Sequence, residues 1–118
     1  MGDDDVFRNP ALAVDAIALR GDTGVVEVLM IRRGADPWKG SLALPGGFVD
    51  IGEDPEEAVL RELLEETGVS GSEPQLFAVR GAPDRDPRKH IVSIFYLVEV
   101  DVDSVPEAGD DASDAVWV

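Results

Sequence analysis

Three glutamates, Glu62, Glu65 and Glu66, are spaced i, i+3 and i+4 along the chain. At about 100° per residue, this spacing places all three carboxylates on one face of a helix. Like charges so placed repel by roughly 0.2–0.5 kcal/mol per pair on an exposed helix. Mg²⁺ and Mn²⁺ offset such repulsion, because they prefer carboxylate oxygens and accept water or phosphate in their other positions. The pattern predicts either a divalent-metal site or, in a chain this acidic, a solvated acidic face.

The residues around these glutamates carry the signals of a capped helix. Asp54 offers an acceptor at the N-cap, Pro55 suits the first helical position, and Glu57 completes a capping box. Gly68 supplies the C-terminal stop, so we predict a helix over residues 55–67. Its apolar arc, which should lie on a sheet, consists of Val59, Leu60, Leu63 and Leu64.

The loop before the helix extends this pattern into a longer motif. Residues 47–69 read GFVDIGEDPEEAVLRELLEETGV. The fixed positions of the motif are Gly47, Glu53, Arg61, Glu62, Leu63, Glu65, Glu66, Gly68 and Val69. With every one of them at its spacing, the chain resembles a Nudix hydrolase. The resemblance implies an α/β (α+β) fold, a Nudix-type α/β/α sandwich with a mixed sheet.

The resemblance also implies roles for the motif residues. Glu62, Glu65 and Glu66 match the positions that ligate a divalent metal, Mg²⁺ with Mn²⁺ as a possible substitute. The backbone carbonyl near Gly46 or Gly47 would add another oxygen. In this family the metals bridge diphosphate oxygens and lower the pKa of a water molecule, which becomes the nucleophile.

The resemblance implies that two further motif residues, Glu53 and Arg61, support the residues that bind the metal. The Glu53 position is a peripheral ligand or supports the ligands, and Arg61 orients the carboxylates by ion pairing. The alternative is an ordinary salt bridge between loop and helix, which contributes little if exposed.

The group that accepts the proton is left open by the sequence. Glu62 or Glu65 could serve, since crowding by like charge raises the proton affinity of a carboxylate. The loop before the last strand offers four other acids, Glu107, Asp110, Asp111 and Asp114.

Segments outside the motif bear on the substrate. Residues 38–48 (WKGSLALPGGF) match the segment that leads into the motif in many Nudix enzymes. Residues 85–88 (RDPR) resemble bacterial and archaeal ADP-ribose pyrophosphatases. Arg85 and Arg88 could bind the terminal phosphate or ribose of a substrate, because a guanidinium fork matches a phosphate. Alternatively, they pair with the aspartates of their own loop.

Two aromatic residues, Trp38 and Phe48, flank the glycine-rich loop. Either ring could stack on adenine, and Phe48 is the candidate substrate contact, while the alternative for both is a place in the core. His90, the single histidine of the chain, is expected to be structural. Trp117 is expected to pack inside.

The resemblance implies Mg²⁺-dependent hydrolysis of a nucleoside diphosphate linked to another moiety. ADP-ribose is the leading substrate, with AMP and ribose 5-phosphate as products. One alternative is a house-cleaning pyrophosphohydrolase of (d)NTPs. The other is a sensor that binds ADP-ribose without hydrolysing it; such sensors commonly lose motif carboxylates, and this chain keeps them.

The remaining sequence divides into apolar strands and polar turns. The expected strands are residues 11–19, 25–31, 42–44, 75–80, 91–100 and 115–118. The expected connections include residues 20–24, 32–41 and 81–88. Nudix domains usually continue from a last strand like 115–118 into a helix that covers the second face of the sheet. That C-terminal helix is missing here, so we expect further residues or, alternatively, the partner subunit of a homodimer to cover this face.

The composition of the chain limits the class of protein and the partners that we expect. The chain has 118 residues, 44% of them hydrophobic, which suggests one Nudix domain over residues 1–118. A formal net charge of −15 argues against nucleic-acid binding, which needs a basic footprint. The absence of cysteine excludes disulfides and thiolate sites. With no membrane-length apolar run and no basic, apolar leader at MGDDD, we expect a cytoplasmic protein that acts on a small nucleotide.

The composition of the charged residues predicts a halophilic source. Two lysines stand against eight arginines, and fifteen aspartates against ten glutamates, which resembles a hydrated acidic surface. Salt screens the repulsion within such a surface, so we expect the stability to rise with salt. Unfolding midpoints in molar KCl and in dilute buffer measure this, and equal midpoints would refute the prediction.

Overall fold

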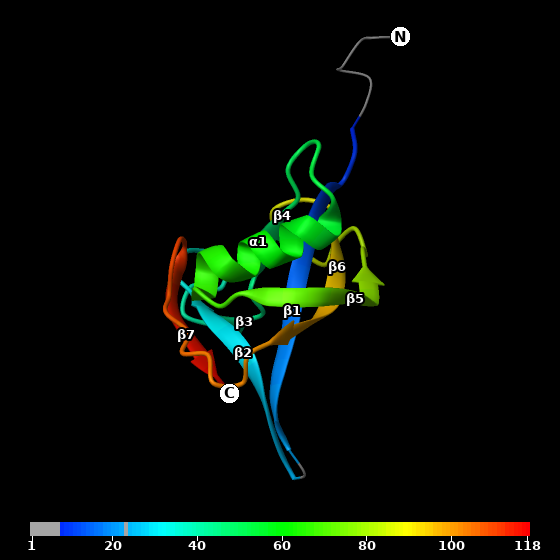
Figure 1. Cartoon of the computed structure of the whole chain (residues 1–118). Coiled ribbons are helices and arrows are strands. Elements are labelled where there is room, and N and C mark those ends of the chain that lie inside the picture. The colour runs from blue at the N-terminus through cyan, green and yellow to red at the C-terminus, as the bar shows by residue number, and fades with distance from the viewer. Residues whose placement is uncertain (1–7, 23) are drawn as a thin grey trace.

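The computed structural model describes residues 8–22 and 24–118. Within them, one helix, α1 (Pro55–Thr67), lies across a twisted sheet (Figure 1). The strands are β1 (Ala11–Asp22), β2 (Val25–Arg33), β3 (Leu42–Ala43), β4 (Gly46–Phe48), β5 (Gly71–Arg80), β6 (Ile91–Val100) and β7 (Ala112–Trp117). They are ordered β3-β2-β1-β6-β5, with β4 paired to β1 and β7 paired to β2.

β1 is the strand around which the sheet is organised. It runs parallel to β6, from the pair Ala11↔Ile91 to the pair Ala18↔Val98. It runs antiparallel to β2, with which it forms the long hairpin that projects from the molecule (Figure 1). The predicted mixed sheet is therefore confirmed. β4 pairs antiparallel with β1 at Ala13↔Phe48 and Asp15↔Gly46, which carries the glycine-rich loop onto the middle of the sheet.

Element boundaries follow the prediction where local signals are strong. The helix over 55–67 and the strand over 91–100 have the expected limits. β1 extends into the predicted turn 20–24, because Gly21 and Asp22 still pair with Val26 and Val25. β2 begins at Val25 as expected and continues two residues beyond its expected end, to Arg33. Backbone pairing does not require apolar side chains, so the hydrophobic pattern predicted a hairpin that was too short. Thr23, within the same turn, lies outside the described residues.

The other strands differ from the expectation by a few residues. β5 begins at Gly71, four residues early, and its register shifts between Ser72 and Gln75. The intervening Pro74 is tolerated because β5 is an edge strand. β7 begins at Ala112 because it pairs with β2 as far as Arg33. β3 ends at Ala43.

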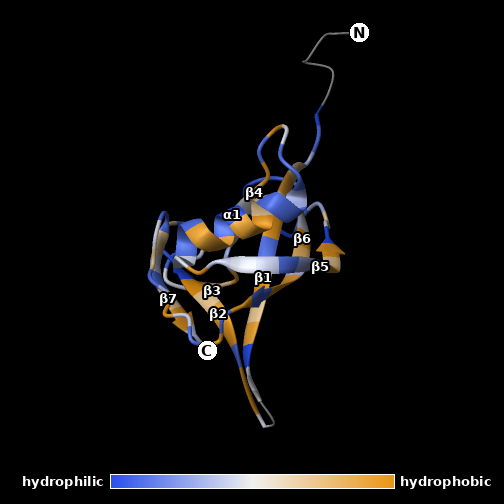
Figure 2. Cartoon of the chain, viewed as in Figure 1, coloured by the Kyte–Doolittle hydropathy of each residue, from blue (hydrophilic) through white to orange (hydrophobic). Residues whose placement is uncertain are grey.

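The core lies between α1 and the sheet. Val59 and Leu63 are fully buried and belong to the same cluster as Val14, Ala16 and Ala18 of β1. The small side chains on β1 let the helix approach the sheet closely. Figure 2 shows that hydrophobic segments of α1 and of the strands alternate with hydrophilic ones.

The apolar arc of the helix was predicted incorrectly at one position. Leu64 is 50% exposed, whereas Glu66 is only 9% exposed. Val59, Leu63 and Glu66 are spaced i, i+4 and i+7, so they form a single stripe facing the sheet. One metal-site candidate therefore lies on the buried face of the helix and not on a separate polar face.

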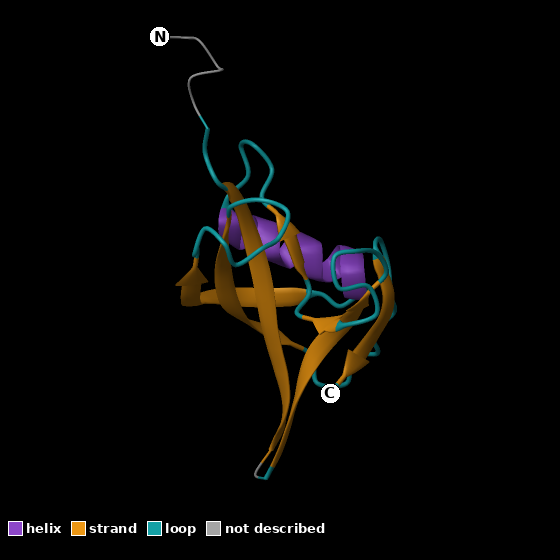
Figure 3. Ribbon diagram, turned by 180° about the vertical axis from the view of Figure 1, so that it is seen from behind, coloured by secondary structure: helices purple, strands orange, loops and turns teal. Residues whose placement is uncertain are grey.

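The other side of the sheet presents strands and loops (Figure 3). Among residues 8–22 and 24–118, no second helix covers it, as expected from the sequence. No helix in this part of the chain is long and apolar enough to cross a membrane.

Candidate active site

The caps of α1 fix how its side chains face the glycine-rich loop. The backbone N–H of Glu56 donates to Asp54 Oδ1 at 2.8 Å, and that of Asp54 donates to Glu57 Oε1 at 3.4 Å. Gly68 adopts the left-handed conformation at φ 70° and its N–H donates to the Leu64 carbonyl. The predicted capping box and C-terminal stop are both present, so the register of Arg61 to Glu66 is fixed at both ends.

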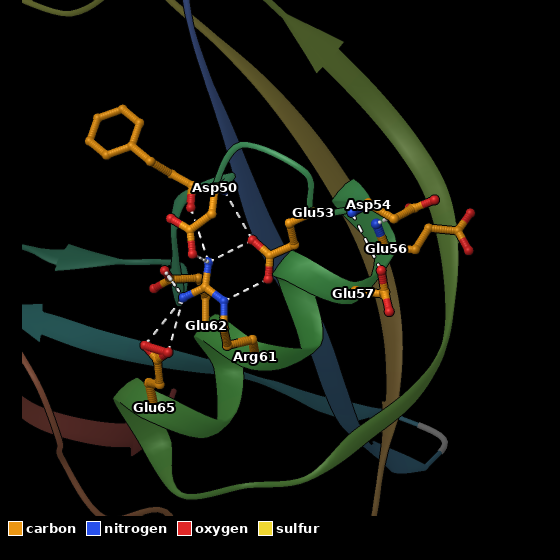
Figure 4. Close-up of polar contacts among 9 residues, drawn as sticks. Asp50, Glu53, Asp54, Glu56, Glu57, Arg61, Glu62 and Glu65 are labelled. Carbon is orange, nitrogen blue, oxygen red and sulfur yellow. Dashed lines mark hydrogen bonds and ion pairs between the residues drawn. The ribbon is translucent and has the colours of Figure 1, made fainter.

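Arg61 joins the loop to the acidic face of the helix (Figure 4). Its Nε and Nη2 donate to both carboxylate oxygens of Glu53, at 2.7 and 2.9 Å. Its Nη1 donates to Glu62 at 2.8 Å and to Glu65 at 2.9 Å. The predicted ion pairing is thus present, and a guanidinium offsets part of the repulsion among the carboxylates.

These contacts shift the pKa values of the groups involved. The hydrogen bonds from Arg61 hold the pKa of Glu53 down at about 2, and those to Glu53 and Glu65 raise the pKa of Arg61. Burial raises the pKa of Glu62, and Arg61 opposes that rise. Glu53 and Arg61 are therefore both charged at neutral pH.

Glu66 lies deeper than the other two glutamates. Its Oε1 accepts a hydrogen bond of 2.8 Å from the backbone N–H of Gly46. Burial raises its pKa to about 7, and the negative charges of Glu62, Asp110 and Asp15 add to the rise, against the Gly46 hydrogen bond. Burial and the negative charges around Glu66 therefore outweigh the stabilisation of its carboxylate by the Gly46 N–H.

The glycines of the loop allow its close approach to these groups. A Cβ on Gly47 would lie 2.5 Å from the carboxylate of Glu62. A Cβ on Gly46 would lie 2.1 Å from the backbone oxygen of Val14. Gly46 therefore requires glycine for space, because backbone cannot move aside, whereas a side chain at position 47 would force the Glu62 carboxylate to move.

A pocket of about 620 Å³ opens beside the loop. Alternate residues of β1 and β6 line it, namely Ala13, Asp15, Ser93 and Phe95. Its acidic lining consists of Asp15, Glu62, Glu66, Asp110 and Asp111, together with Asp36 and Asp86. Its basic lining consists of Arg33, Arg85 and Arg88. The pocket thus places carboxylates and guanidiniums around one space.

The pocket gathers some of the predicted site residues and not others. Those that line it are Gly47, Phe48, Glu62, Glu66, Arg85 and Arg88. Three others lie outside the lining. Of these, Glu53 and Glu65 both accept hydrogen bonds from the guanidinium of the third, Arg61. In the described residues, no three acidic or histidine side chains form a ready-made metal group. The donors are nevertheless hard oxygens with excess negative charge, a set that suits Mg²⁺ or Mn²⁺.

The two loop arginines behave differently. Arg88 Nη2 donates to Asp86 at 2.9 Å and lowers the pKa of Asp86 to about 2, so it pairs within its own loop. Arg85 Nη2 donates at 2.7 Å to the hydroxyl of Ser93, which is 5% exposed. The Arg85 side chain is therefore bonded to the sheet, in the pocket, whereas the Arg88 side chain is bonded to an aspartate of its own loop.

Asp15 is a site residue that the sequence reasoning missed. Burial raises its pKa to about 6, and Arg85 opposes that rise. It stands alone among apolar residues in the strand segment 11–19, and a single acid inside an apolar strand was the available signal. Ser93 carried no comparable signal.

The aromatic residues and the histidine considered in the sequence have the following surroundings. Lys89 and Arg88 lie over the ring of Phe48, at 5.0 and 5.8 Å from its centroid. His90 Nε2 lies 2.8 Å from the Gly81 carbonyl, as a structural histidine would. Trp117 is partly buried against the core, and its Nε1 donates to Ser104.

Comparison with known proteins gives concordant similarities. The model of the NUDIX domain matches residues 9–118. An ADP-ribose pyrophosphatase of Methanocaldococcus jannaschii is 44% identical over 110 residues, which cover 93% of this chain and 62% of that protein. The chain thus spans less than two thirds of the length of this relative.

Two solved structures are similar over nearly the whole chain. The NUDIX domain of Shewanella oneidensis NrtR, in complex with ADP ribose, has a TM-score of 0.87 at 30% identity, covering 98% of this chain and 76% of that one. A bifunctional NMN adenylyltransferase/ADP ribose pyrophosphatase of Francisella tularensis, in complex with AMP and a manganese ion, has a TM-score of 0.76 at 32% identity. It covers 95% of this chain, which corresponds to 34% of that protein.

Proposed function

The chain belongs to the NUDIX family, and on that basis we propose that it hydrolyses a nucleoside diphosphate linked to another moiety, with Mg²⁺ as its cofactor. ADP-ribose is the leading substrate, and AMP and ribose 5-phosphate are the products. One observation carries the proposal: a single pocket lined by Glu62 and Glu66 and also by Arg85. A diphosphate needs positive charge around it, and this pocket has a guanidinium beside the acidic cluster that is proposed to bind the metal.

The residues proposed to hold the metal are Glu62, Glu65, Glu66 and the backbone of Gly47. A bound Mg²⁺ or Mn²⁺ supplies charge neutralisation at diphosphate oxygens and makes a coordinated water more acidic. Arg61 now engages Glu62 and Glu65, so it serves to orient them. Glu53 in turn holds Arg61 through two hydrogen bonds.

Other residues of the pocket are proposed to bind the substrate and move the proton. Arg85, anchored on Ser93, is placed to bind a phosphate or the ribose. Arg88 lies over the ring of Phe48, and both residues line the pocket and are proposed to contact the substrate there. Glu62 is the favoured proton acceptor, because it lines the pocket and its pKa is raised by burial.

Hydrolysis of a substrate panel tests this proposal. The protein is incubated with Mg²⁺ and ADP-ribose, NADH, diadenosine polyphosphates or nucleoside triphosphates, and the products are separated by chromatography. We expect AMP and ribose 5-phosphate from ADP-ribose. Cleavage of triphosphates alone would replace this assignment with the (d)NTP pyrophosphohydrolase.

A sensor is the second candidate, because the similar NrtR domain was solved with ADP ribose. Binding of ADP-ribose by calorimetry separates the two. Tight binding with no product formed from any member of the panel would favour the sensor.

Arg61→Ala is expected to lower kcat by about 10–100-fold, because Glu62 and Glu65 lose the group that orients them. The loss of unfolding free energy should be smaller, about 1 kcal/mol or less, since the Arg61 side chain is 30% exposed. Arg20→Ala is the matched control: Arg20 is also 30% exposed and pairs with Glu27 away from the pocket. A loss of stability as large as the loss of turnover would contradict the orienting role.

A further inference from the structure

Trp38 is a large aromatic side chain exposed inside the pocket. It lies in the connection between β2 and β3, lines the pocket, and remains 53% exposed. Its backbone has φ 61°, in the left-handed region that non-glycine residues seldom adopt. A bulky residue held in this conformation costs free energy, and such residues gather at binding and catalytic sites.

The connection that carries Trp38 is held by the end of β2. Arg33 Nε donates to the Pro37 carbonyl at 2.6 Å, and Arg32 Nη1 donates to the Gly40 carbonyl at 2.7 Å. The N–H of Ser41 donates to the Trp38 carbonyl at 3.0 Å. Hydrogen bonds therefore hold the backbone before, at and after Trp38, and so fix the point from which the indole enters the pocket.

Phe48, the other aromatic candidate, has its ring face occupied. Lys89 Nζ lies 5.0 Å and the Arg88 guanidinium 5.8 Å from the Phe48 centroid. Among the described residues, the cation–π contacts involve Phe48 and Trp117 and none involves Trp38. Both rings line one pocket, but only the Trp38 ring is without such a cation.

We propose that Trp38 is the residue on which the purine base of the substrate stacks. This inference rests on the proposed function, because it requires a nucleotide in the pocket. The base then lies at the β2–β3 side, while the diphosphate lies towards Glu62, Glu66 and Arg85. Aromatic stacking tolerates different bases, since each has a π-face, so Trp38 selects for a base and not for one particular base.

The tryptophan fluorescence of the protein tests the proposal without turnover. The chain has two tryptophans, so Trp117→Phe leaves Trp38 as the only indole. With Mg²⁺ present, AMP should quench this fluorescence saturably, whereas ribose 5-phosphate, which has no base, should not. The matched control is Trp38→Phe, in which the fluorescence of Trp117 should not respond to AMP. An unchanged signal with AMP, or an equal response to ribose 5-phosphate, would overturn the assignment.

Calorimetry covers the case in which Trp117→Phe does not fold, since Trp117 packs on the core. Trp38→Ala should bind AMP about 10–100-fold more weakly, and Trp38→Phe should stay within a few-fold of the original protein. Affinity for ribose 5-phosphate should be the same in all three. Unchanged AMP binding by Trp38→Ala would overturn the stacking role.

The two proposals fail separately in these experiments. AMP binding that depends on Trp38, in a protein that cleaves nothing, would leave the stacking role standing and remove the hydrolase. Cleavage of ADP-ribose with AMP binding independent of Trp38 would do the reverse.

Discussion

Glu66→Gln is expected to reduce the proposed Mg²⁺-dependent hydrolysis of ADP-ribose by about 100-fold or more, because a carboxylate proposed as a metal ligand becomes a neutral amide. The amide oxygen still accepts the hydrogen bond that Gly46 donates to Glu66. The local packing therefore persists, and the loss is confined to charge. Steady-state kinetics with Mg²⁺ varied from zero to saturation measures the loss and the expected weaker dependence on the metal.

The same variant should lose activity but should not lose stability when metal is absent. The pKa of Glu66 is raised to about 7 in the folded protein, above the usual value of 4.5. A raised carboxylate pKa means that the folded state binds more protons between those values, so stability without metal falls as pH rises from about 4.5 to 7. Glutamine removes that loss, so at pH 8 the metal-free variant should unfold no earlier than the original protein.

Glu56→Gln makes the same chemical change in an exposed residue of the first turn of the helix. It should leave turnover within a few-fold. Full activity of Glu66→Gln would contradict the metal site itself.

Gly47→Ala is expected to lower kcat by about 100-fold while the fold is retained. The added Cβ would stand 2.5 Å from the Glu62 carboxylate, so that side chain must move away from its present place. The atom displaced is the far end of a flexible side chain, so the cost to folding is modest. Geometric errors of about 1 Å at a reacting group can cost about 100-fold in rate. Kinetics and thermal unfolding of the same sample give both quantities.

Gly46→Ala is the informative comparison for this prediction. Its Cβ would meet the Val14 backbone oxygen at 2.1 Å, and backbone in a sheet cannot move aside. We expect a loss of about 1–3 kcal/mol of unfolding free energy or more. If Gly47→Ala destabilised the protein as much as Gly46→Ala while sparing turnover, the placement of Glu62 against the loop would be wrong.

The sequence predicted the parts of the site that depend on local signals. Helix α1 was predicted with its correct limits because its caps, Asp54 and Gly68, are adjacent to it in sequence. The ion pairing of Arg61 followed from the motif. The long apolar strand at 91–100 was predicted for the same local reason.

What the sequence could not predict arises from contacts between elements of the fold. Asp15 reaches the pocket because β1 pairs in parallel with β6 and antiparallel with β4. Arg85 lies in the pocket with its side chain bonded to Ser93, eight residues later in β6, and no sequence signal marked that contact. The burial of Glu66 depends on which helical stripe meets the sheet, and an apolar count favoured Leu64 instead. Each of these features follows from tertiary contacts and cannot be inferred from the hydrophobic periodicity of the sequence.

The most direct test of the metal-dependent hydrolysis is the release of AMP from ADP-ribose by one sample under three conditions. The protein is assayed with Mg²⁺, then after chelation with EDTA, then after excess Mg²⁺ is restored. We predict turnover, its loss and its recovery, with the turnover of Glu66→Gln at least about 100-fold lower wherever Mg²⁺ is present. AMP release that persists undiminished in EDTA, or no AMP from ADP-ribose at saturating Mg²⁺, would contradict this mechanism.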